Sequence, residues 1–185
     1  VVGALSLDGR VRSIRGALPV TLLAARHRQR LVLPAANLRE GRIVAGVDLH
    51  AATSLAQLAA DLRNRARSAM PAGVETGSRR APAALDLVDV RGQHSARRAV
   101  EIAAAGRHNL LLVGPPGAGK TLLARRVPGI LPAPSFEEAV ASTAIHSVAG
   151  LLEPSAGLLE DRPFRAPHHS ASGVALIGGG CRIRQ

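Results

Sequence analysis

The chain has 185 residues, which suits one ordinary domain or two small ones, and 46% of them are hydrophobic, which excludes a chain disordered by composition. Phe136 and Phe164 are the only aromatic residues, so the core is expected to consist of Leu, Val, Ile and Ala. The net charge is +11, no run approaches about 18 apolar residues and Cys181 is the single cysteine. We therefore expect a cytoplasmic protein without a membrane span, a signal peptide, an internal disulfide or a cysteine-based zinc site.

The N-terminal elements predict a small α+β unit. Residues 4–14 alternate polar and apolar side chains around Asp8-Gly9, which predicts a β-hairpin with a type I′ turn. A helix is expected over 17–27, a strand over 31–34 and a second strand within 44–49. Thr53 or Ser54 then caps an amphipathic helix. Its apolar side is formed by Leu55, Leu58, Leu62 and Ala66.

A proline- and glycine-rich stretch follows at residues 71–82, and we interpret it as an interdomain linker because it shows no periodicity. Beyond it, a helix is expected near 95–105, with Gly106 as the residue just past its end. Pro128 and Pro132 predict a break after the next helix. Ser135 and Glu138 have the spacing of a capping box, which predicts that another helix begins there.

The segment most informative about function runs from Leu110 to Thr121. Leu110–Val113 is an apolar run typical of a strand, residues 114–121 read G-P-P-G-A-G-K-T, and the next residues favour a helix, as in a phosphate-binding P-loop. Its glycines let backbone N–H groups converge on phosphates, Lys120 reaches the β- and γ-phosphates, and the Thr121 hydroxyl can ligate Mg²⁺. A glycine- and proline-rich connector is the structural alternative. The predicted phosphate-binding residues are Gly114, Pro115, Pro116, Gly117, Ala118, Gly119, Lys120 and Thr121.

Several motifs together resemble a known family, the magnesium-chelatase-like AAA+ ATPases, and within it the YifB/ComM type, which is linked to DNA branch migration in natural transformation. They are D-V-R-G-Q, G-P-P-G-A-G-K-T, T-A-I-H-S-V-A-G, R-P-F-R-A-P-H-H-S-A-S and G-G-G. The resemblance implies an α/β fold: the N-terminal half of a P-loop NTPase (AAA+) module, preceded by a partial α+β domain similar to ribosomal protein S5 domain 2 and the Lon protease domain. The implied division is 1–70, a linker 71–82, and 83–185. The resemblance fails at residues 181–185.

Further site residues follow from this resemblance. It places Val90, Arg91 and Gly92 near the adenine of ATP, beside the P-loop residues that hold the phosphates and Mg²⁺. Arg165, His168 and His169 belong to a family signature whose chemical role the sequence does not give. Adjacent histidine side chains diverge and no third ligand has suitable spacing, so we favour packing or contact with a neighbouring subunit over metal ligation.

Two enzymatic activities can be weighed from the residues. A Lon-type Ser–Lys dyad needs a lysine, and the only lysine is Lys120 in the P-loop, so proteolysis is excluded. ATP hydrolysis needs an acidic pair at the end of a buried strand. The only candidate, Glu160-Asp161, follows just two leucines and is interpreted as a surface turn. The chain is therefore expected to stop before its catalytic acids and to be inactive alone.

The expected partners are ATP, further copies of the chain in a ring (a hexamer in the full-length relative) and possible DNA. Residues 1–80 carry 13 arginines against 5 acidic residues, a net charge of +8, which favours nucleic acid. An arginine-rich codon usage is the alternative explanation. The alternative functions are a chelatase-type subunit that remodels a protein partner and a nucleotide-binding remnant without activity. An N-terminal Lon-like domain favours the YifB/ComM type.

Overall fold

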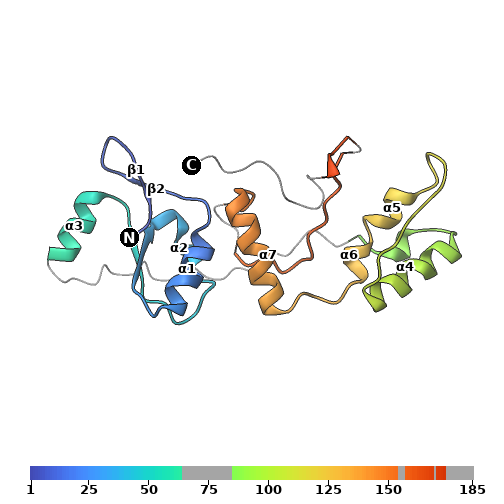
Figure 1. The fold of residues 1–185 in the computed structure, drawn as a ribbon, viewed down its shortest axis with the longest axis horizontal. Helices are drawn as coiled ribbons and strands as arrows, with labels where there is room; N and C mark the ends of the chain where they lie inside the picture. The colour runs from blue at the N-terminus through green and yellow to red at the C-terminus, as the bar shows by residue number, and fades with distance from the viewer. Residues whose placement is uncertain (64–84, 154–156, 169, 174–185) are drawn as a thin grey trace. The chain divides into compact units, whose positions relative to one another are not determined.

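The computed structural model describes residues 1–63, 85–153, 157–168 and 170–173, and it has a mixed α/β fold (Figure 1). The chain divides into two compact units. Unit 1 comprises Val1–Ala84 and Leu131–Arg162, and unit 2 comprises Leu85–Ile130 and Pro163–Gln185. The predicted linker 71–82, Ala66, His169, the G-G-G motif and residues 181–185 lie outside the described residues. Within the described part, no helix has the length and apolar character needed to cross a membrane.

Unit 1 begins with the predicted hairpin, in which β1 (Ala4–Leu5) pairs antiparallel with β2 (Val11–Arg12). The predicted type I′ turn is wrong, because it requires a positive φ at both Asp8 and Gly9, and only Gly9 has one, at 79°. The Gly9 amide donates to the Ser6 carbonyl, closing a longer loop. The Asp8 carboxylate accepts hydrogen bonds from Ser6 Oγ and the Arg10 amide, and these bonds lower the pKa of Asp8.

The core of unit 1 lies around two parallel strands. The predicted helix is α1 (Ala17–Arg26), and the predicted strand 31–34 is β3 (Leu31–Pro34), so both are confirmed. β3 pairs with β4 (Leu49–Ala52), with Leu31 opposite Leu49, through a connection containing a 3₁₀ turn (Ala35–Asn37) and α2 (Leu38–Gly41). The core members are Ala17, Ala24, Leu31, Leu33, Leu38 and Leu49.

The strand predicted within residues 44–49 is misplaced, because β4 begins only at Leu49. Residues just past α2 continue in hydrogen-bonded turns, with the Val44 amide donating to the Gly41 carbonyl. Gly46 then adopts a φ of 79°, which an extended strand does not allow. The backbone therefore becomes extended later than the apolar pattern indicated.

Helix α3 (Leu55–Arg63) is capped by Ser54, whose Oγ accepts a hydrogen bond from the Gln57 amide. This confirms one of the two predicted caps. Its apolar side does not form a core within the described part: Leu55 and Leu62 are exposed, and no residue of the helix is buried.

Helix α7 (Phe136–Ala149) packs against α1 within unit 1. The predicted capping box is confirmed, with Ser135 and Glu138 each bonding the other's backbone amide. The side of α7 that is buried carries small and hydroxyl side chains, namely Ala139, Thr143 and Ser147. Ser147 Oγ accepts a hydrogen bond from the Gly16 amide at 2.9 Å, which fixes α7 to the start of α1.

Unit 2 contains a 3₁₀ turn (Leu87–Asp89), α4 (His94–Gly106), α5 (Lys120–Ala124) and α6 (Val127–Ile130) around a core of Leu87, Val90, Val100 and Leu123. The predicted break is confirmed, since α5 ends before Pro128 and α6 ends before Pro132. The predicted role of Gly106 is wrong: it closes α4, and Arg107 takes the left-handed conformation with a φ of 54°. A Cβ on Gly106 would overlap the His108 ring, which explains the glycine.

The strand predicted at Leu110–Val113 is also not found. These residues adopt no regular secondary structure, and Leu111 and Val113 are each 84% exposed. Neither of the two sheets among the described residues includes this segment. An apolar run without a neighbouring strand has no partner for its backbone N–H and C=O groups, so it cannot form a ladder.

Candidate nucleotide-binding site

The predicted phosphate loop has the backbone geometry that its glycines allow. Gly117 and Gly119 have φ angles of 80° and 78°, a region that side-chain-bearing residues rarely adopt. Gly119 is the N-cap of α5, and the Leu123 amide donates to its carbonyl at 3.0 Å. The loop therefore ends at a helix start, where free backbone N–H groups are available to an anion.

Lys120 is the first residue of α5, and its side chain turns back over the loop. Its Nζ donates hydrogen bonds to the carbonyls of Gly114 and Pro115, both at 2.7 Å. An ammonium group has three N–H donors, so these two bonds use two of them and hold the positive charge against the backbone of residues 114 and 115. Thr121 follows directly and is exposed, and its hydroxyl is an oxygen ligand of the type that Mg²⁺ prefers.

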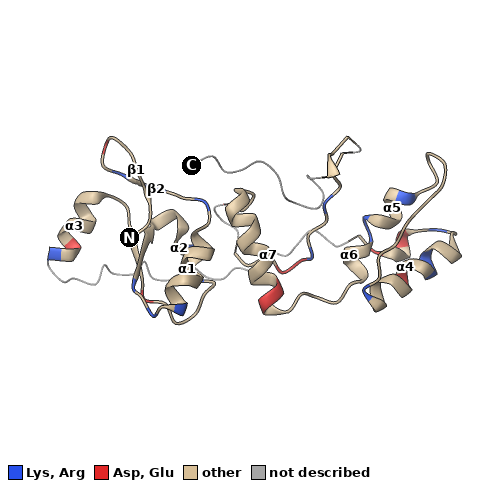
Figure 2. Ribbon diagram, in the orientation of Figure 1, with Lys and Arg blue, Asp and Glu red and all other residues tan. Residues whose placement is uncertain are grey.

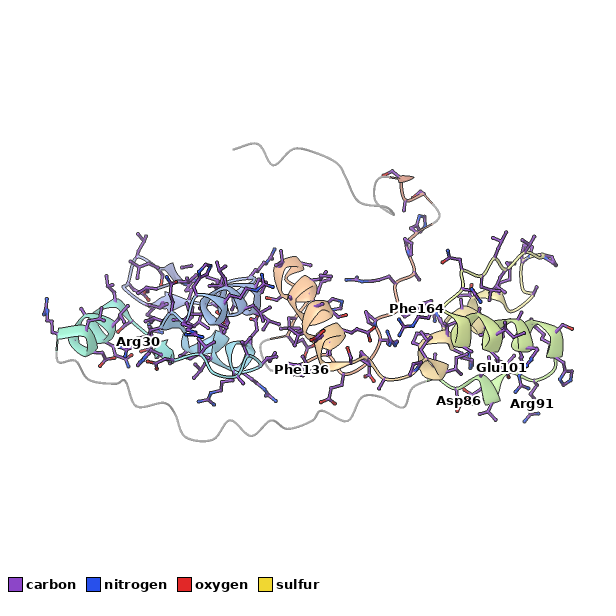
Figure 3. The ribbon with its side chains drawn as sticks, turned by 60° about the horizontal axis from the view of Figure 1, so that its bottom comes forward. Arg30, Asp86, Arg91, Glu101, Phe136 and Phe164 are labelled. Atoms are coloured by element: carbon purple, nitrogen blue, oxygen red, sulfur yellow. The ribbon has the colours of Figure 1, made fainter. Side chains whose placement is uncertain are left out.

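The segment predicted to lie near adenine differs among its three residues. Val90 is 2% exposed, and its side chain packs in the core of unit 2. Arg91 and Gly92 are exposed, and the Arg91 side chain is labelled in Figure 3. A ligand could therefore reach the side chain of Arg91 and the backbone of Gly92, whereas Val90 offers at most its backbone.

Sequence reasoning missed Gln93, the residue that joins this segment to the phosphate loop. Gln93 Nε2 donates a hydrogen bond to the Ala118 carbonyl at 3.0 Å. Gln93 is the last residue of D-V-R-G-Q, which was the only signal in the sequence that it matters. The structure thus joins the end of segment 90–93 to the phosphate loop at Ala118.

Arg126 is a second residue that sequence reasoning missed. Its side chain is largely buried, and its guanidinium donates to the Asp86 carbonyl at 2.9 Å and to the Leu122 carbonyl at 3.0 Å. It also lies 3.4 Å from the Asp89 carboxylate. Arg126, just past the end of α5, therefore connects the phosphate-loop helix to Asp86, the first residue of segment 86–93. No local sequence pattern marks it.

The signature residues R-P-F-R-A-P-H-H have separate surroundings. Arg162, which was not singled out, donates to the Pro132 carbonyl at 2.7 Å and to Glu138 at 3.0 Å, so it holds the start of α7. Arg165 and His168 are exposed, and His168 Nδ1 lies 2.7 Å from Ser170 Oγ. Among the described residues, no group of three His, Cys, Asp or Glu could hold a metal ion.

The acidic pair Glu160-Asp161 is exposed, and Asp161 lies in a bend, as the interpretation of a surface turn predicts. The nearby Leu159 amide donates to Thr143 Oγ1 at 3.0 Å, which attaches this turn to α7 in unit 1. The pair therefore lies outside the strand context that an ATPase gives its catalytic acids.

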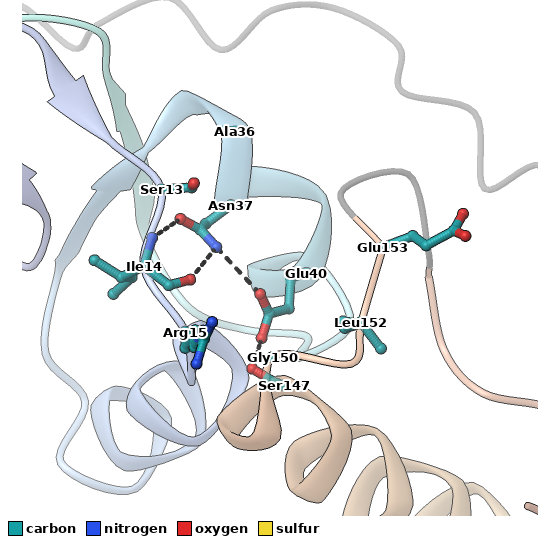
Figure 4. Close-up of a pocket in the computed structure, with 10 residues that line it drawn as sticks. All are labelled: Ser13, Ile14, Arg15, Ala36, Asn37, Glu40, Ser147, Gly150, Leu152 and Glu153. Atoms are coloured by element: carbon teal, nitrogen blue, oxygen red, sulfur yellow. Dashed lines mark hydrogen bonds between the residues drawn. The ribbon is translucent and has the colours of Figure 1, made fainter.

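A cavity in unit 1 is the other candidate site (Figure 4). It has a volume of about 320 Å³, and its lining includes Arg15, Asn37, Glu40 and Ser147. The buried Glu40 carboxylate already accepts hydrogen bonds from the Leu18 amide, Asn37 Nδ2 and Ser147 Oγ. Because these donors satisfy the carboxylate, the polar side of the cavity serves to join α1, α2 and α7.

Comparison with known proteins gives matches along nearly the whole chain. The family model described as magnesium chelatase, subunit ChlI, matches residues 86–185, which include the phosphate loop. An uncharacterized protein of Mycobacterium tuberculosis is 50% identical over 181 residues, the competence protein ComM of Haemophilus influenzae 38% over 186, and the protein YifB of Escherichia coli 40% over 180. Each match covers 97% of this chain. The chain spans 36%, 36% and 35% of these relatives, respectively.

Proposed function

Because this chain belongs to the magnesium chelatase subunit ChlI family of AAA+ proteins, related to ComM and YifB, we propose that unit 2 binds Mg²⁺-ATP. The observation that carries the proposal is the placement of the Lys120 ammonium against the Gly114 and Pro115 carbonyls, at the start of a helix. The loop backbone and Lys120 would hold the phosphates. The Thr121 hydroxyl would hold Mg²⁺, and Arg91 and Gly92 would contact the base.

For the N-terminal residues we propose a partial domain similar to ribosomal protein S5 domain 2 and the Lon domain, over 1–70, with a linker at 71–82 and the AAA+ module over 83–185. The support is the α+β content of residues 1–63, in which the hairpin, α1 and the parallel pair β3–β4 follow one another. Under this division α7 is part of the AAA+ module, although it packs against α1.

For the longer protein we propose a ring-forming ATPase that acts on DNA. ComM is named a competence protein, and the support from this chain is its charge. Residues 1–63 contain nine arginines against four acidic residues, and Figure 2 marks the positions of basic residues in blue along the ribbon of unit 1. Residues 26–30, R-H-R-Q-R, run from the last residue of α1 to the residue before β3 and are all exposed, so their cations can reach phosphates.

The proposed ATP site is tested by Lys120→Ala. Charge-assisted hydrogen bonds of this kind are worth roughly 1.5–3 kcal/mol, so ATP affinity is expected to fall about 10- to 150-fold. Isothermal titration calorimetry with Mg²⁺-ATP measures the change. Arg98→Ala on the exposed side of α4 removes the same charge and is the matched control. Equal affinity of Lys120→Ala and the parent chain, with both folded by circular dichroism, contradicts the proposal.

DNA binding is tested by the salt dependence of Arg26→Ala/Arg28→Ala. If both arginines contact phosphates, the slope of log affinity against log salt becomes less negative by about 0.9 for each contact on duplex DNA. Fluorescence anisotropy with duplex and branched DNA at several salt concentrations measures this slope. An unchanged slope, or no binding by the folded parent chain at low salt, argues against phosphate contacts at these residues and favours a protein partner.

A further inference from the structure

Gln93 has an unusual backbone conformation for a residue with a long side chain. Its φ and ψ are 50° and 42°, in the left-handed region, directly after Gly92, whose φ is 68°. Side-chain-bearing residues other than Asn and Asp rarely adopt this region. Among the described residues other than glycine, only Arg28 and Arg107 also have a positive φ, and they lie next to helix ends at C-terminal turns. Gln93 instead lies at the start of α4.

The conformation places the Gln93 amide against the last part of the phosphate loop. Besides the 3.0 Å hydrogen bond to the Ala118 carbonyl, Nε2 would lie only 2.9 Å from a Cβ on Gly119. Real Cβ atoms are almost never this close to another heavy atom, so a side chain at position 119 would displace the amide. The fit between Gln93 and the loop therefore includes both a hydrogen bond and direct packing.

Residues 86–93 are thus attached to the loop and its helix at both ends. Arg126 bonds the Asp86 carbonyl at one end, and Gln93 bonds the Ala118 carbonyl at the other. Arg91 and Gly92, exposed between these attachments, are the residues we place near adenine. Of the two attachments, Gln93 is the one that directly follows Gly92 and that contacts the phosphate loop itself.

We infer that Gln93 is a positioning residue that holds Arg91 and Gly92 at the distance from the phosphate loop at which one nucleotide contacts both. This inference rests on the proposed ATP site. A ligand gains from two sets of contacts only when they are held in the right mutual geometry before it binds. Loss of the Gln93 amide therefore lowers the affinity for ATP more than the affinity for inorganic triphosphate, which reaches only the phosphate loop.

The experiment measures binding of Mg²⁺-ATP and of Mg²⁺-triphosphate to the 185-residue chain by calorimetry. The variants are Gln93→Ala, Gln93→Gly and, as a matched control, Gln29→Ala at an exposed glutamine of unit 1. In Gln93→Ala and Gln93→Gly, the ratio of ATP affinity to triphosphate affinity is expected to fall about 3- to 10-fold, the effect of one hydrogen bond. Gln29→Ala is expected to leave the ratio unchanged.

Gln93→Gly separates the side chain from the backbone, because glycine adopts a positive φ readily. A parent-like ratio in this variant would show that only the conformation matters and would overturn the inference. An unchanged ratio in Gln93→Ala, or equal losses for ATP and triphosphate, would also overturn it, the latter by indicating a purely structural role. If the parent chain binds neither ligand, the proposed function fails and the inference fails with it. ATP binding by the parent with an unchanged ratio in the variants removes the inference alone.

Discussion

Two apolar segments of four residues, Leu31–Pro34 in unit 1 and Leu110–Val113 in unit 2, have similar compositions and different surroundings. All four residues of the first are buried, with Leu33 at 0% exposure, and each pairs with a residue of β4. In the second, Leu111 and Val113 are exposed, and no strand pairs with the segment among the described residues. Apolar composition provides a tendency to form a strand, whereas a neighbouring strand provides the hydrogen bonds and the cover.

The partner of β3 is supplied by the connection that follows it. Parallel strands need a crossover, and residues 35–48 provide one that contains α2. Leu38 of α2 and Ala17 of α1 then cover the strands and join Leu33 in one core. Residues 111–113 instead lead directly into the phosphate loop. Among the described residues, the loop in unit 2 is therefore shaped by its own glycines, by Lys120 and by Gln93, and no strand pairs with it.

The largest expected effect compares the same substitution in the two segments. Leu33→Ala removes a fully buried side chain and is expected to lower the free energy of unfolding by about 2–5 kcal/mol. Leu111→Ala removes a side chain that is already in water, so its effect is expected to stay within about 0.5 kcal/mol. Urea unfolding followed by circular dichroism measures both.

The comparison contains its own control, because the chemical change is identical and only the surroundings differ. Similar losses for Leu33→Ala and Leu111→Ala would mean that Leu111 is packed in solution, as expected of a strand with a neighbour. A small effect at Leu33 would instead contradict the core assigned to unit 1.

Local signals predicted much of the fold correctly. Helix α1, β3, the Ser54 cap and the capping box of Ser135 and Glu138 depend on residues close in sequence, and all were predicted. The errors at the Asp8-Gly9 turn and at Gly106 arise because several residues could adopt the left-handed conformation. The choice depends on contacts such as that of His108 with Gly106.

Other features depend on contacts between residues far apart in sequence. The bond between Gly16 and Ser147 joins α7 to the N-terminal core, and nothing near either residue indicates it. The same holds for Arg126 with Asp86 and for Gln93 with Ala118 in the candidate site. The motif predicted the phosphate-loop residues because glycine and lysine are required there chemically. The residues that support the loop could be found only from the structure.

The smallest expected effect concerns the ends at which β3 and β4 begin. Arg30 precedes β3 and Asp48 precedes β4, and the Arg30 Nε donates to the Asp48 carboxylate at 2.9 Å, while the Leu31 amide donates to the Asp48 carbonyl. The hydrogen bond from Arg30 is the main cause that lowers the pKa of Asp48. His50, whose Nε2 lies 3.0 Å from the Asp48 carboxylate, lowers this pKa further. A lowered pKa contributes stability above the pKa of the unfolded chain, and that contribution is lost as the pH falls through the folded value.

Asp48→Asn removes the titrating group, so the parent chain is expected to lose slightly more stability than this variant between about pH 5 and about pH 3, the range in which an ordinary aspartate titrates. The lowered pKa of Asp8 acts in the same range but is common to both proteins and cancels. Urea unfolding at both pH values measures the difference, with Asp61→Asn on α3 as the control. The effect is expected to be small because the pair is exposed to solvent and screened.

The same pH dependence in Asp48→Asn and the parent chain would mean that Arg30 and Asp48 do not hold the two strand ends together in solution. The pairing of β3 with β4 would then depend on the buried leucines alone.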